Sequence, residues 1–156
     1  MPKVKTMIGW EEWCAFPDLE VPAIKAKVDT GATTSSIHAY DIEPFTKDGV
    51  EFVRFKIHPL QKNKTLEVEC FAPLSDYRNV TSSNGEREKR YVIKTPLIIG
   101  EKTIEAEVTL SSRHKMTFRM LLGRDALRRA KLTVDPAKSF LLGKVTNATE
   151  LYENGE

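Results

Sequence analysis

The sequence predicts a mostly β domain, closed or barrel-like, with one short helix near its C-terminal end. Three observations predict this fold class. Short strand-like runs separated by turn signals dominate the chain of 156 residues. One such run, Ala23 to Val28, alternates apolar and charged side chains with the period of two that is typical of a half-buried strand. One segment, Asp125 to Lys131, is rich in good helix formers.

The expected strands follow one another with turn residues between them. They are Val4–Trp13, Ala23–Val28, Ile42–Phe45, Glu51–Ile57, Leu66–Phe71, Tyr91–Ile99, Thr103–Leu110, Thr117–Leu122 and Leu132–Val134. The chain breaks at Phe16-Pro17-Asp18, and Asp48-Gly49 between two apolar runs is a strong hairpin signal. The polar stretch Ser75–Arg90 is expected to hold a hairpin tip or a loop around Ser82–Gly85.

The C-terminal part of the chain contains the expected helix, which begins at Asp125, where a carboxylate suits the unpaired backbone amides. A turn at Asp135-Pro136 and the segment Ser139–Leu142 then close the domain. Length fits one domain over residues 1–146, followed by a polar C-terminal tail, residues 147–156, that we expect to fray. The chain is too short for two full catalytic lobes.

Composition excludes several classes of function. The 24 basic and 22 acidic residues give a net charge of only +2, which favours neither a nucleic-acid binder nor a membrane-surface protein. No apolar run approaches the about 20 residues that span a bilayer, and the N-terminal residues lack the apolar region of a signal peptide. The two cysteines, Cys14 and Cys70, are expected to be small buried side chains. The expected location is the cytoplasm.

One short motif can carry chemistry. The strand Ala23–Val28 is followed directly by Asp29, Thr30 and Gly31. The Thr30 hydroxyl can donate or accept a hydrogen bond, and glycine allows a close approach of the backbone. The tripeptide alone is compatible with a plain turn or with a carboxylate that faces a substrate from a rigid strand end.

A second segment favours the chemical interpretation. Met120 to Leu127 reads as an apolar strand, a glycine, a charged pair and the start of a helix. Asp29-Thr30-Gly31-Ala32 resembles the active-site signature of retropepsin-like aspartic proteases. Leu121-Leu122-Gly123-Arg124-Asp125 resembles the segment that these proteases pack beside their catalytic loop.

A longer resemblance points to a bacterial family of retropepsin-like proteins whose name refers to ATP-dependent zinc proteases. It covers about residues 5–145. The similar runs are Gly9–Trp13, Ala26–Ala32, Ile37–Ala39, Ser82–Gly85 and Asp135–Lys138. The resemblance implies a closed acid-protease barrel and an aspartic endopeptidase.

The aspartic mechanism needs two carboxyl groups that share one proton, yet the chain has a single Asp-Thr-Gly. Asp135 is followed by Pro136 and Ala137 instead of Thr and Gly, which favours a structural turn there. The resemblance therefore implies a homodimer in which Asp29 of each chain faces the other. It also implies that Thr30 bonds across the dimer axis and that Gly31 contacts substrate.

The remaining site residues are implied by the same resemblance. Ala32, Gly123, Arg124 and Asp125 support the active site. The candidate flap over a bound peptide consists of Ser82, Ser83, Asn84 and Gly85, farther along the chain than a retroviral flap. Thr33 stands where retroviral enzymes typically have an acidic partner for the arginine, so Arg124 must have a different partner.

No cofactor is expected from the residues. The candidate metal ligands lack the close spacing of a zinc site; they are His38, His58, His114, Cys14 and Cys70. The glycine-rich loops that bind ATP are absent. A serine nucleophile elbow is absent too, and nothing further supports a Cys70–His58 pair.

Basic residues form two groups, Arg87–Arg90 and Arg124 with Arg128, Arg129 and Lys131. Either group can be an ordinary solvated surface, whereas a basic flank beside the flap would attract an acidic peptide. Bacterial relatives are associated with ATP-grasp ligases that add glutamates to a ribosomal protein. The expected substrate is thus an acidic or glutamylated protein tail. The alternative is a catalytically silent dimer that binds extended peptides, and neither nucleic acid nor membrane is an expected partner.

Overall fold

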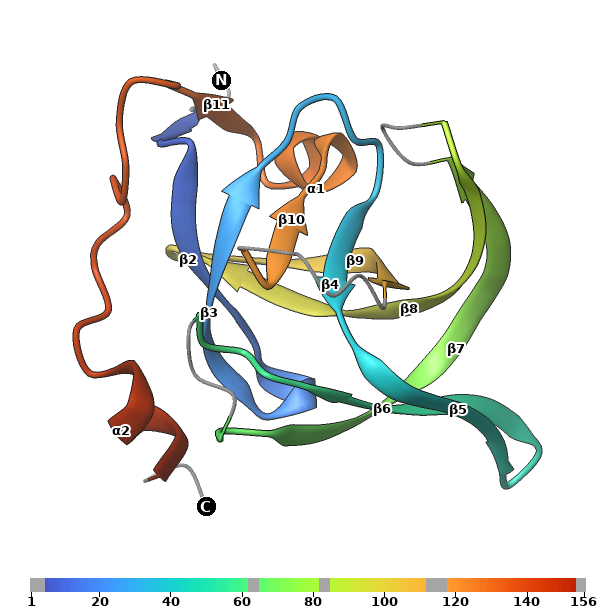
Figure 1. The fold of residues 1–156 in the computed structure, drawn as a ribbon. Coiled ribbons are helices and arrows are strands. Elements are labelled where there is room, and N and C mark those ends of the chain that lie inside the picture. The colour runs from blue at the N-terminus through green and yellow to red at the C-terminus, as the bar shows by residue number, and fades with distance from the viewer. Residues whose placement is uncertain (1–4, 62–64, 82–84, 112–117, 154–156) are drawn as a thin grey trace.

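The computed structural model describes residues 5–61, 65–81, 85–111 and 118–153 (Figure 1). Strands make up 59% of the chain and helices 10%, which confirms the predicted mostly β class. The strands are β1 (Thr6–Ile8), β2 (Glu11–Phe16), β3 (Val21–Val28), β4 (Ser35–His38), β5 (Tyr40–Lys47), β6 (Val50–Ile57), β7 (Val68–Thr81), β8 (Arg87–Ile99), β9 (Lys102–Ser111), β10 (Met120–Leu122) and β11 (Leu132–Val134). The helices are the short 3-10 turn η1 (Pro17–Leu19), α1 (Arg124–Arg129) and α2 (Ala148–Glu153).

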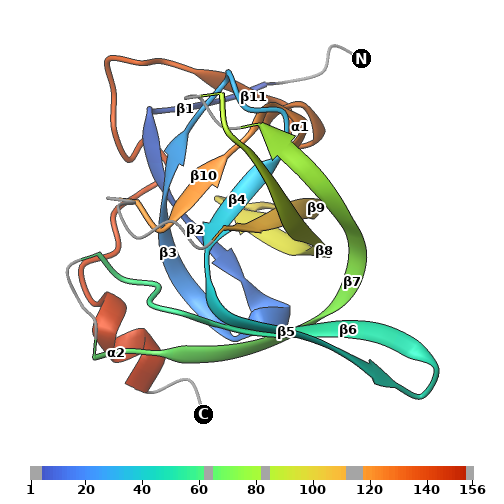
Figure 2. The ribbon, with the colours of Figure 1, turned by 45° about the vertical axis from the view of Figure 1, so that its right-hand side comes forward.

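Nine strands form one sheet in the order β2-β3-β10-β4-β9-β8-β7-β6-β5. β2 also pairs with β8, through Cys14 opposite Ile99 and Ala15 opposite Ile98. This pairing joins β2, β3, β10, β4, β9 and β8 into a closed ring, as in a barrel. β7, β6 and β5 continue the sheet beyond the ring, and the β5–β6 hairpin projects from the body of the molecule (Figure 2).

The barrel core follows from strand alternation. In β2 every second residue is buried, and β6 behaves in the same way from Val53 to Ile57. Side chains with less than 2% exposure come from the strands of the ring and from β6 beyond it, among them Phe16, Ile24, Phe55, Leu97 and Met120. Burial of this apolar surface is the dominant driving force for the fold.

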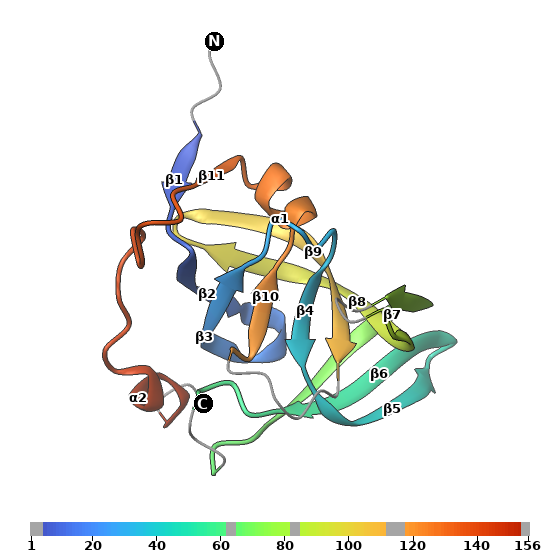
Figure 3. The same cartoon turned by 45° about the horizontal axis from the view of Figure 1, so that its top comes forward.

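The arrangement of β3, β10 and β4 positions the candidate site. β10 lies between the other two strands although it comes much later in the chain (Figure 3). It runs parallel to β3, with Leu122 beside Val28, and antiparallel to β4, with Leu121 beside Ser36. The connection from β3 to β4, residues 29–34, must therefore pass over the end of β10.

The first predicted strand, Val4–Trp13, is interrupted. Gly9 lies at the break. Its backbone passes so close to Lys138 that a Cβ on residue 9 would be 2.3 Å from the Lys138 carbonyl oxygen, which explains why the residue is glycine. β1 consequently leaves the large sheet and pairs in parallel with β11, as Thr6 opposite Leu132. The sequence analysis also missed β4, whose four residues are all buried and so show no alternation.

The polar stretch Ser75–Arg90 includes the paired ends of β7 and β8, which are the arms of a long hairpin. β7 and β8 pair in antiparallel fashion as far as Thr81 opposite Arg87. Gly85 is exposed and has a positive φ of 85°. Ser82, Ser83 and Asn84 lie outside the described residues.

The C-terminal tail differs from the expectation of fraying and of one short helix. Residues Ala148–Glu153 form the second helix, α2. The Tyr152 hydroxyl donates a hydrogen bond to the carbonyl oxygen of Ala23 on β3. This tertiary contact explains a helix that the polar sequence alone does not predict.

Candidate active site

The site is built on the end of β3, where Asp29 follows the last strand residue. The backbone N–H of Asp29 donates to the Leu122 carbonyl oxygen at 2.9 Å, which fixes it to the end of β10. The Gly31 N–H donates to Oδ1 of Asp29 at 2.9 Å, and the Ala32 N–H donates to its carbonyl oxygen at 3.2 Å. The half-buried Asp29 carboxylate is thus oriented by its own loop, while Thr30 and Gly31 are exposed.

The start of α1 holds the other side of this loop. The backbone N–H groups of Arg124 and Asp125 donate to the carbonyl oxygens of Ala32 and Thr33 at 2.8 and 3.0 Å. The Arg124 guanidinium donates to the Thr33 hydroxyl at 3.0 Å and to the Thr30 carbonyl oxygen at 3.4 Å. The partner of Arg124 is therefore Thr33, which occupies the position where retroviral enzymes typically have an acidic residue.

Gly123 is required by close backbone packing. Its N–H donates to the buried Ser35 hydroxyl at 3.0 Å. A Cβ at this position would lie 2.7 Å from the carbonyl carbon of Thr34 and 3.0 Å from the Ser35 nitrogen. The loop can cross the end of β10 at this distance because residue 123 has no side chain.

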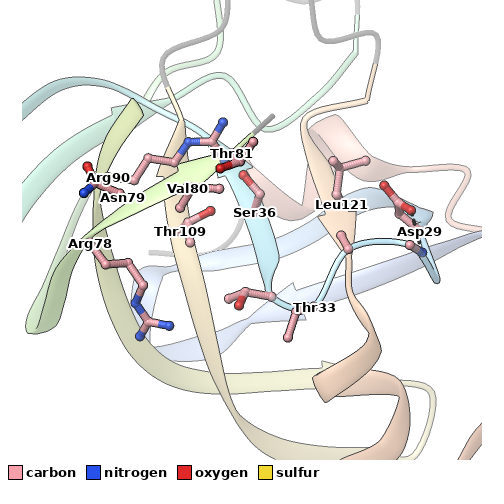
Figure 4. Close-up of a pocket in the computed structure, with 13 residues that line it drawn as sticks. Asp29, Thr33, Ser36, Arg78, Asn79, Val80, Thr81, Arg90, Thr109 and Leu121 are labelled. Carbon is pink, nitrogen blue, oxygen red and sulfur yellow. Dashed lines mark hydrogen bonds between the residues drawn. The ribbon is translucent and has the colours of Figure 1, made fainter. Parts of the chain in front are cut away.

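A cleft of about 510 Å³ opens beside the loop (Figure 4). Its walls come from the loop, from β4, β9 and β10, and from the arms of the β7–β8 hairpin. The described lining residues outside the loop are Ser36, Thr109, Leu121, Arg78, Asn79, Val80, Thr81 and Arg90. The structure thus brings the candidate motif and the arms of the candidate flap hairpin to one cavity.

The charges in the cleft are uneven. Asp29 is the only acidic residue among the described residues that line it, and two arginines lie across from it (Figure 4). Arg78 is paired with Asp76 at 3.0 Å and with Glu107 at 3.2 Å. Arg90 is 8% exposed, and its Nε lies 3.4 Å from Glu88. Sequence reasoning did not single out Arg78.

Comparison with known proteins agrees with this geometry. The family described as "RimB-like: Retropepsin-like aspartic endopeptidase RimB" matches residues 7–144. The chain belongs to the RimB-like family. This assignment confirms the retropepsin-like resemblance inferred from the two sequence motifs.

Curated relatives of this RimB-like chain are named "Probable alpha-L-glutamate ligase". The protein from Shewanella pealeana is 52% identical over 140 residues, or 90% of this chain. The protein from Desulfotalea psychrophila is 50% identical over 142 residues, or 91% of the chain. In both cases the match spans only 30% of the relative's own length.

A solved structure shares the RimB-like fold. It is the crystal structure of a protein of unknown function from Legionella pneumophila, with a TM-score of 0.75 and 27% sequence identity. The match covers 89% of this chain and 99% of the other.

The other described titratable candidates do not line the cleft; they are Asp135, Cys14, Cys70, His38 and His58, whereas His114 lies outside the described residues. Asp135 accepts a hydrogen bond from the Ala137 N–H at 3.0 Å, and its own N–H donates to the Ile8 carbonyl oxygen, so it forms a structural turn. Both cysteines are buried and unpaired with each other, and burial raises the pKa of each thiol to about 12. The Cys70 thiol lies against the carbonyl oxygen of Leu19. The His58 ring is in hydrogen-bond contact with the carbonyl oxygen of Leu66.

Within the described residues, no group of three or more His, Cys, Asp or Glu side chains could hold a metal ion. None of the helices in that part of the chain has the length and apolarity to cross a bilayer.

Sequence reasoning missed the part that Glu12 plays in holding the domain together. Its carboxylate is fully buried and accepts hydrogen bonds from the N–H groups of Gly9, Leu141 and Leu142 at 2.7, 2.8 and 3.1 Å. The signal was present, because Glu12 occupies the same face of the strand as the apolar residues Cys14 and Phe16. An acidic residue at a position where the strand alternation places buried side chains indicates a buried carboxylate that accepts hydrogen bonds from nearby N–H groups.

Proposed function

We propose that this chain supplies one half of the active site of a homodimeric aspartic endopeptidase. One observation carries the proposal: Asp29 is held by its loop, opens to a cleft, and has no second acid among the described residues that line this cleft. An aspartic mechanism needs two carboxyl groups. A second copy of the chain, related by a twofold axis, supplies the other one.

In the proposed dimer, one Asp29 carboxylate takes a proton from a water molecule. The protonated Asp29 of the partner subunit donates a hydrogen bond to the carbonyl oxygen of the scissile peptide. The water oxygen then adds to the carbonyl carbon, and the C–N bond breaks as the leaving nitrogen accepts a proton. The two carboxyl groups share one proton, because like charges at such short range cannot both persist.

The neighbouring residues take supporting roles in this proposal. Thr30 is exposed beside Asp29, where its hydroxyl can bond across the dimer axis. Gly31 orients the carboxylate and leaves the backbone open to substrate. Arg124 ties the loop to α1. The candidate flap, Ser82 to Gly85, follows Thr81 in the sequence, and Thr81 lines the cleft at the end of β7.

The substrate that we propose is an acidic or glutamylated protein tail. Arg78 and Arg90 place two guanidinium groups at the cleft wall, where acidic side chains of a bound peptide would compete with their present partners Asp76, Glu107 and Glu88. The relatives' name, alpha-L-glutamate ligase, supports a link to a ligase system, since this chain matches a segment of those longer proteins. A protease for glutamylated tails would remove the glutamate residues that such a ligase adds.

The deciding experiment compares wild type with Asp29→Asn on glutamylated and neutral peptides over about pH 3 to 8. We expect cleavage by wild type, faster on the acidic peptide at low salt, and none by Asp29→Asn. Asp135→Asn is the matched control, since Asp135 forms a turn outside the cleft, and it should retain activity.

Equal rates on both peptides would remove the acidic-substrate proposal. If wild type cleaves no peptide but binds both, the non-catalytic peptide-binding dimer is the correct interpretation.

A further inference from the structure

A second pocket, which the proposed mechanism does not use, lies beside α1. It encloses about 240 Å³ and is lined by Lys5, Arg124, Leu127, Arg128, Lys131 and Leu132. We call it the α1 pocket. Four of its six lining residues are cationic and two are leucines, and no acidic residue lines it within the described chain.

Helix geometry and strand pairing gather these cations. Arg124 and Arg128 are four residues apart, and Lys131 is three further on, so one side of the helix and its C-terminal turn carries all three. Lys131 is fixed by its backbone, since its carbonyl oxygen accepts the Thr6 N–H at 3.1 Å. That same hydrogen bond brings the adjacent Lys5 to the pocket.

This arrangement leaves like charges unneutralised. Like charges four residues apart on a helix destabilise it. No salt bridge within the described residues involves Lys5, Arg128 or Lys131, whose side chains are exposed. A bound anion would supply the missing countercharge.

Arg124 connects the α1 pocket to the candidate active site. Its side chain lines the pocket, and its guanidinium donates to the Thr30 carbonyl oxygen and the Thr33 hydroxyl in the Asp29 loop. Arg124 therefore contacts both the α1 pocket and the loop that lines the cleft.

We propose that the α1 pocket is an accessory binding site for the carboxylate side chains of an acidic peptide, outside the catalytic cleft. The inference rests on the proposed function and extends its acidic substrate to residues beyond the cut bond. The cations bind carboxylates, and Leu127 and Leu132 contact the methylene groups of glutamate side chains.

An acidic peptide fits this pocket better than a nucleic acid does. No aromatic side chain lines the pocket, so it offers no surface on which bases could stack. The net charge of +2 also provides no extended positive field for a phosphate backbone. Its volume of about 240 Å³ suits a few side chains.

The test measures binding in the Asp29→Asn background, where cleavage cannot interfere. The probe is a fluorescent oligoglutamate peptide, followed by anisotropy at low and high salt. We expect Arg128→Gln with Lys131→Gln to weaken binding about tenfold, since each exposed pair contributes up to about fivefold. Arg129→Gln is the matched control, because Arg129 is an exposed cation on the same helix but does not line the pocket. It should change the affinity less than about twofold.

Two outcomes would overturn the proposal. One is equal weakening by Arg129→Gln and by Arg128→Gln made alone, which would indicate a general charge effect. The other is a single-stranded RNA that binds more tightly than the peptide and depends on the same two residues. Thermal melting of each variant verifies that it is folded.

The proposal and the function on which it rests fail differently. If the pocket variants lose peptide affinity but wild type cleaves no peptide, the α1 pocket stands and the peptidase does not. If wild type cleaves acidic and neutral peptides and the pocket variants leave KM for the acidic peptide unchanged, the peptidase stands and the pocket proposal falls.

Discussion

At the residue scale, two glycines of the candidate site serve different physical purposes. A Cβ on Gly123 would meet backbone atoms of Thr34 and Ser35 at 2.7 to 3.0 Å, which can move only if the strands move. A Cβ on Gly31 would meet only Oδ1 of Asp29, at 3.2 Å. Gly123 therefore supports the packing of the loop on the barrel, whereas Gly31 sets the position of the carboxylate.

Alanine substitutions should separate these two effects. Gly123→Ala should lower the free energy of unfolding by about 1–3 kcal/mol through overpacking. Gly31→Ala should change it by less than about 1 kcal/mol, yet reduce kcat/KM at least about tenfold because the carboxylate is displaced. Urea denaturation and peptide cleavage measure the two quantities. If the Gly123→Ala variant has the same free energy of unfolding as wild type, the loop is free to move away from β10.

The buried thiols of Cys14 and Cys70 make the free energy of unfolding depend on pH. Burial raises the pKa of Cys14 from 9.0 to about 12, and the nearby Glu12 carboxylate adds to the shift. Between these values the unfolded chain releases the thiol proton and the folded chain retains it. Unfolding therefore becomes more favourable as the pH rises, by at most about 1.4 kcal/mol per pH unit for each thiol.

Cys14→Ala removes one of these contributions. In the presence of reductant, the free energy of unfolding of this variant should fall less steeply above pH 9 than that of wild type. Below pH 9 the two proteins should show parallel dependence on pH. Identical slopes above pH 9, measured by urea denaturation, would mean that Cys14 titrates alike in both states.

At the scale of elements, β2 connects the barrel to the chain segments around it. The Glu12 carboxylate on β2 accepts N–H groups from the bend at Gly9 and from Leu141 and Leu142 in the C-terminal segment. These donors compensate for the burial of a charge. One side chain thereby joins three separate parts of the fold.

Glu12→Gln tests this connection. The amide nitrogen of glutamine cannot accept a hydrogen bond, so at least one buried donor loses its partner. We expect the free energy of unfolding to fall by about 2–3 kcal/mol. Hydrogen exchange should accelerate at Leu141 and Leu142. Glu11→Gln is the control, because the half-buried Glu11 carboxylate accepts the Ser139 hydroxyl at 3.1 Å, a bond that the side-chain oxygen of glutamine can keep. Equal effects of the two substitutions would contradict the prediction.

Comparison of predicted and observed elements shows which signals are local. Strand β3 and the helix α1 were predictable, because period-two alternation and helix propensity lie within each segment. β4 was not, since Ser35 to His38 are buried on both faces and show no pattern. The helix α2 was missed because it depends on a contact between Tyr152 and Ala23.

The candidate site also combines features that the sequence predicts with features that only the folded structure shows. The Asp29 motif and the Gly123 segment were recognisable from residue types, and the structure brings them together. The bond from Arg124 to Thr33 and the position of Arg78 in the cleft depend on the packing of distant strands. Spacing along the sequence carries no information about such contacts.

At the scale of the whole molecule, the closed ring of strands presents one Asp29 to one cleft. A chain of this length has no second Asp-Thr-Gly to complete the pair. If catalysis requires Asp29 of both subunits, activity must depend on how chains are paired and not only on how many functional chains are present.

Mixing experiments distinguish these two cases. When wild type and Asp29→Asn exchange freely at equal amounts, about one quarter of the dimers contain two intact chains. Cleavage per total protein should then fall to about one quarter of the pure wild-type rate, because a dimer with one carboxyl group lacks either the base or the acid. A mixture of wild type with Asp135→Asn should keep the full rate. A fall to about one half with Asp29→Asn would show that each chain acts alone, and the shared active site would have to be abandoned.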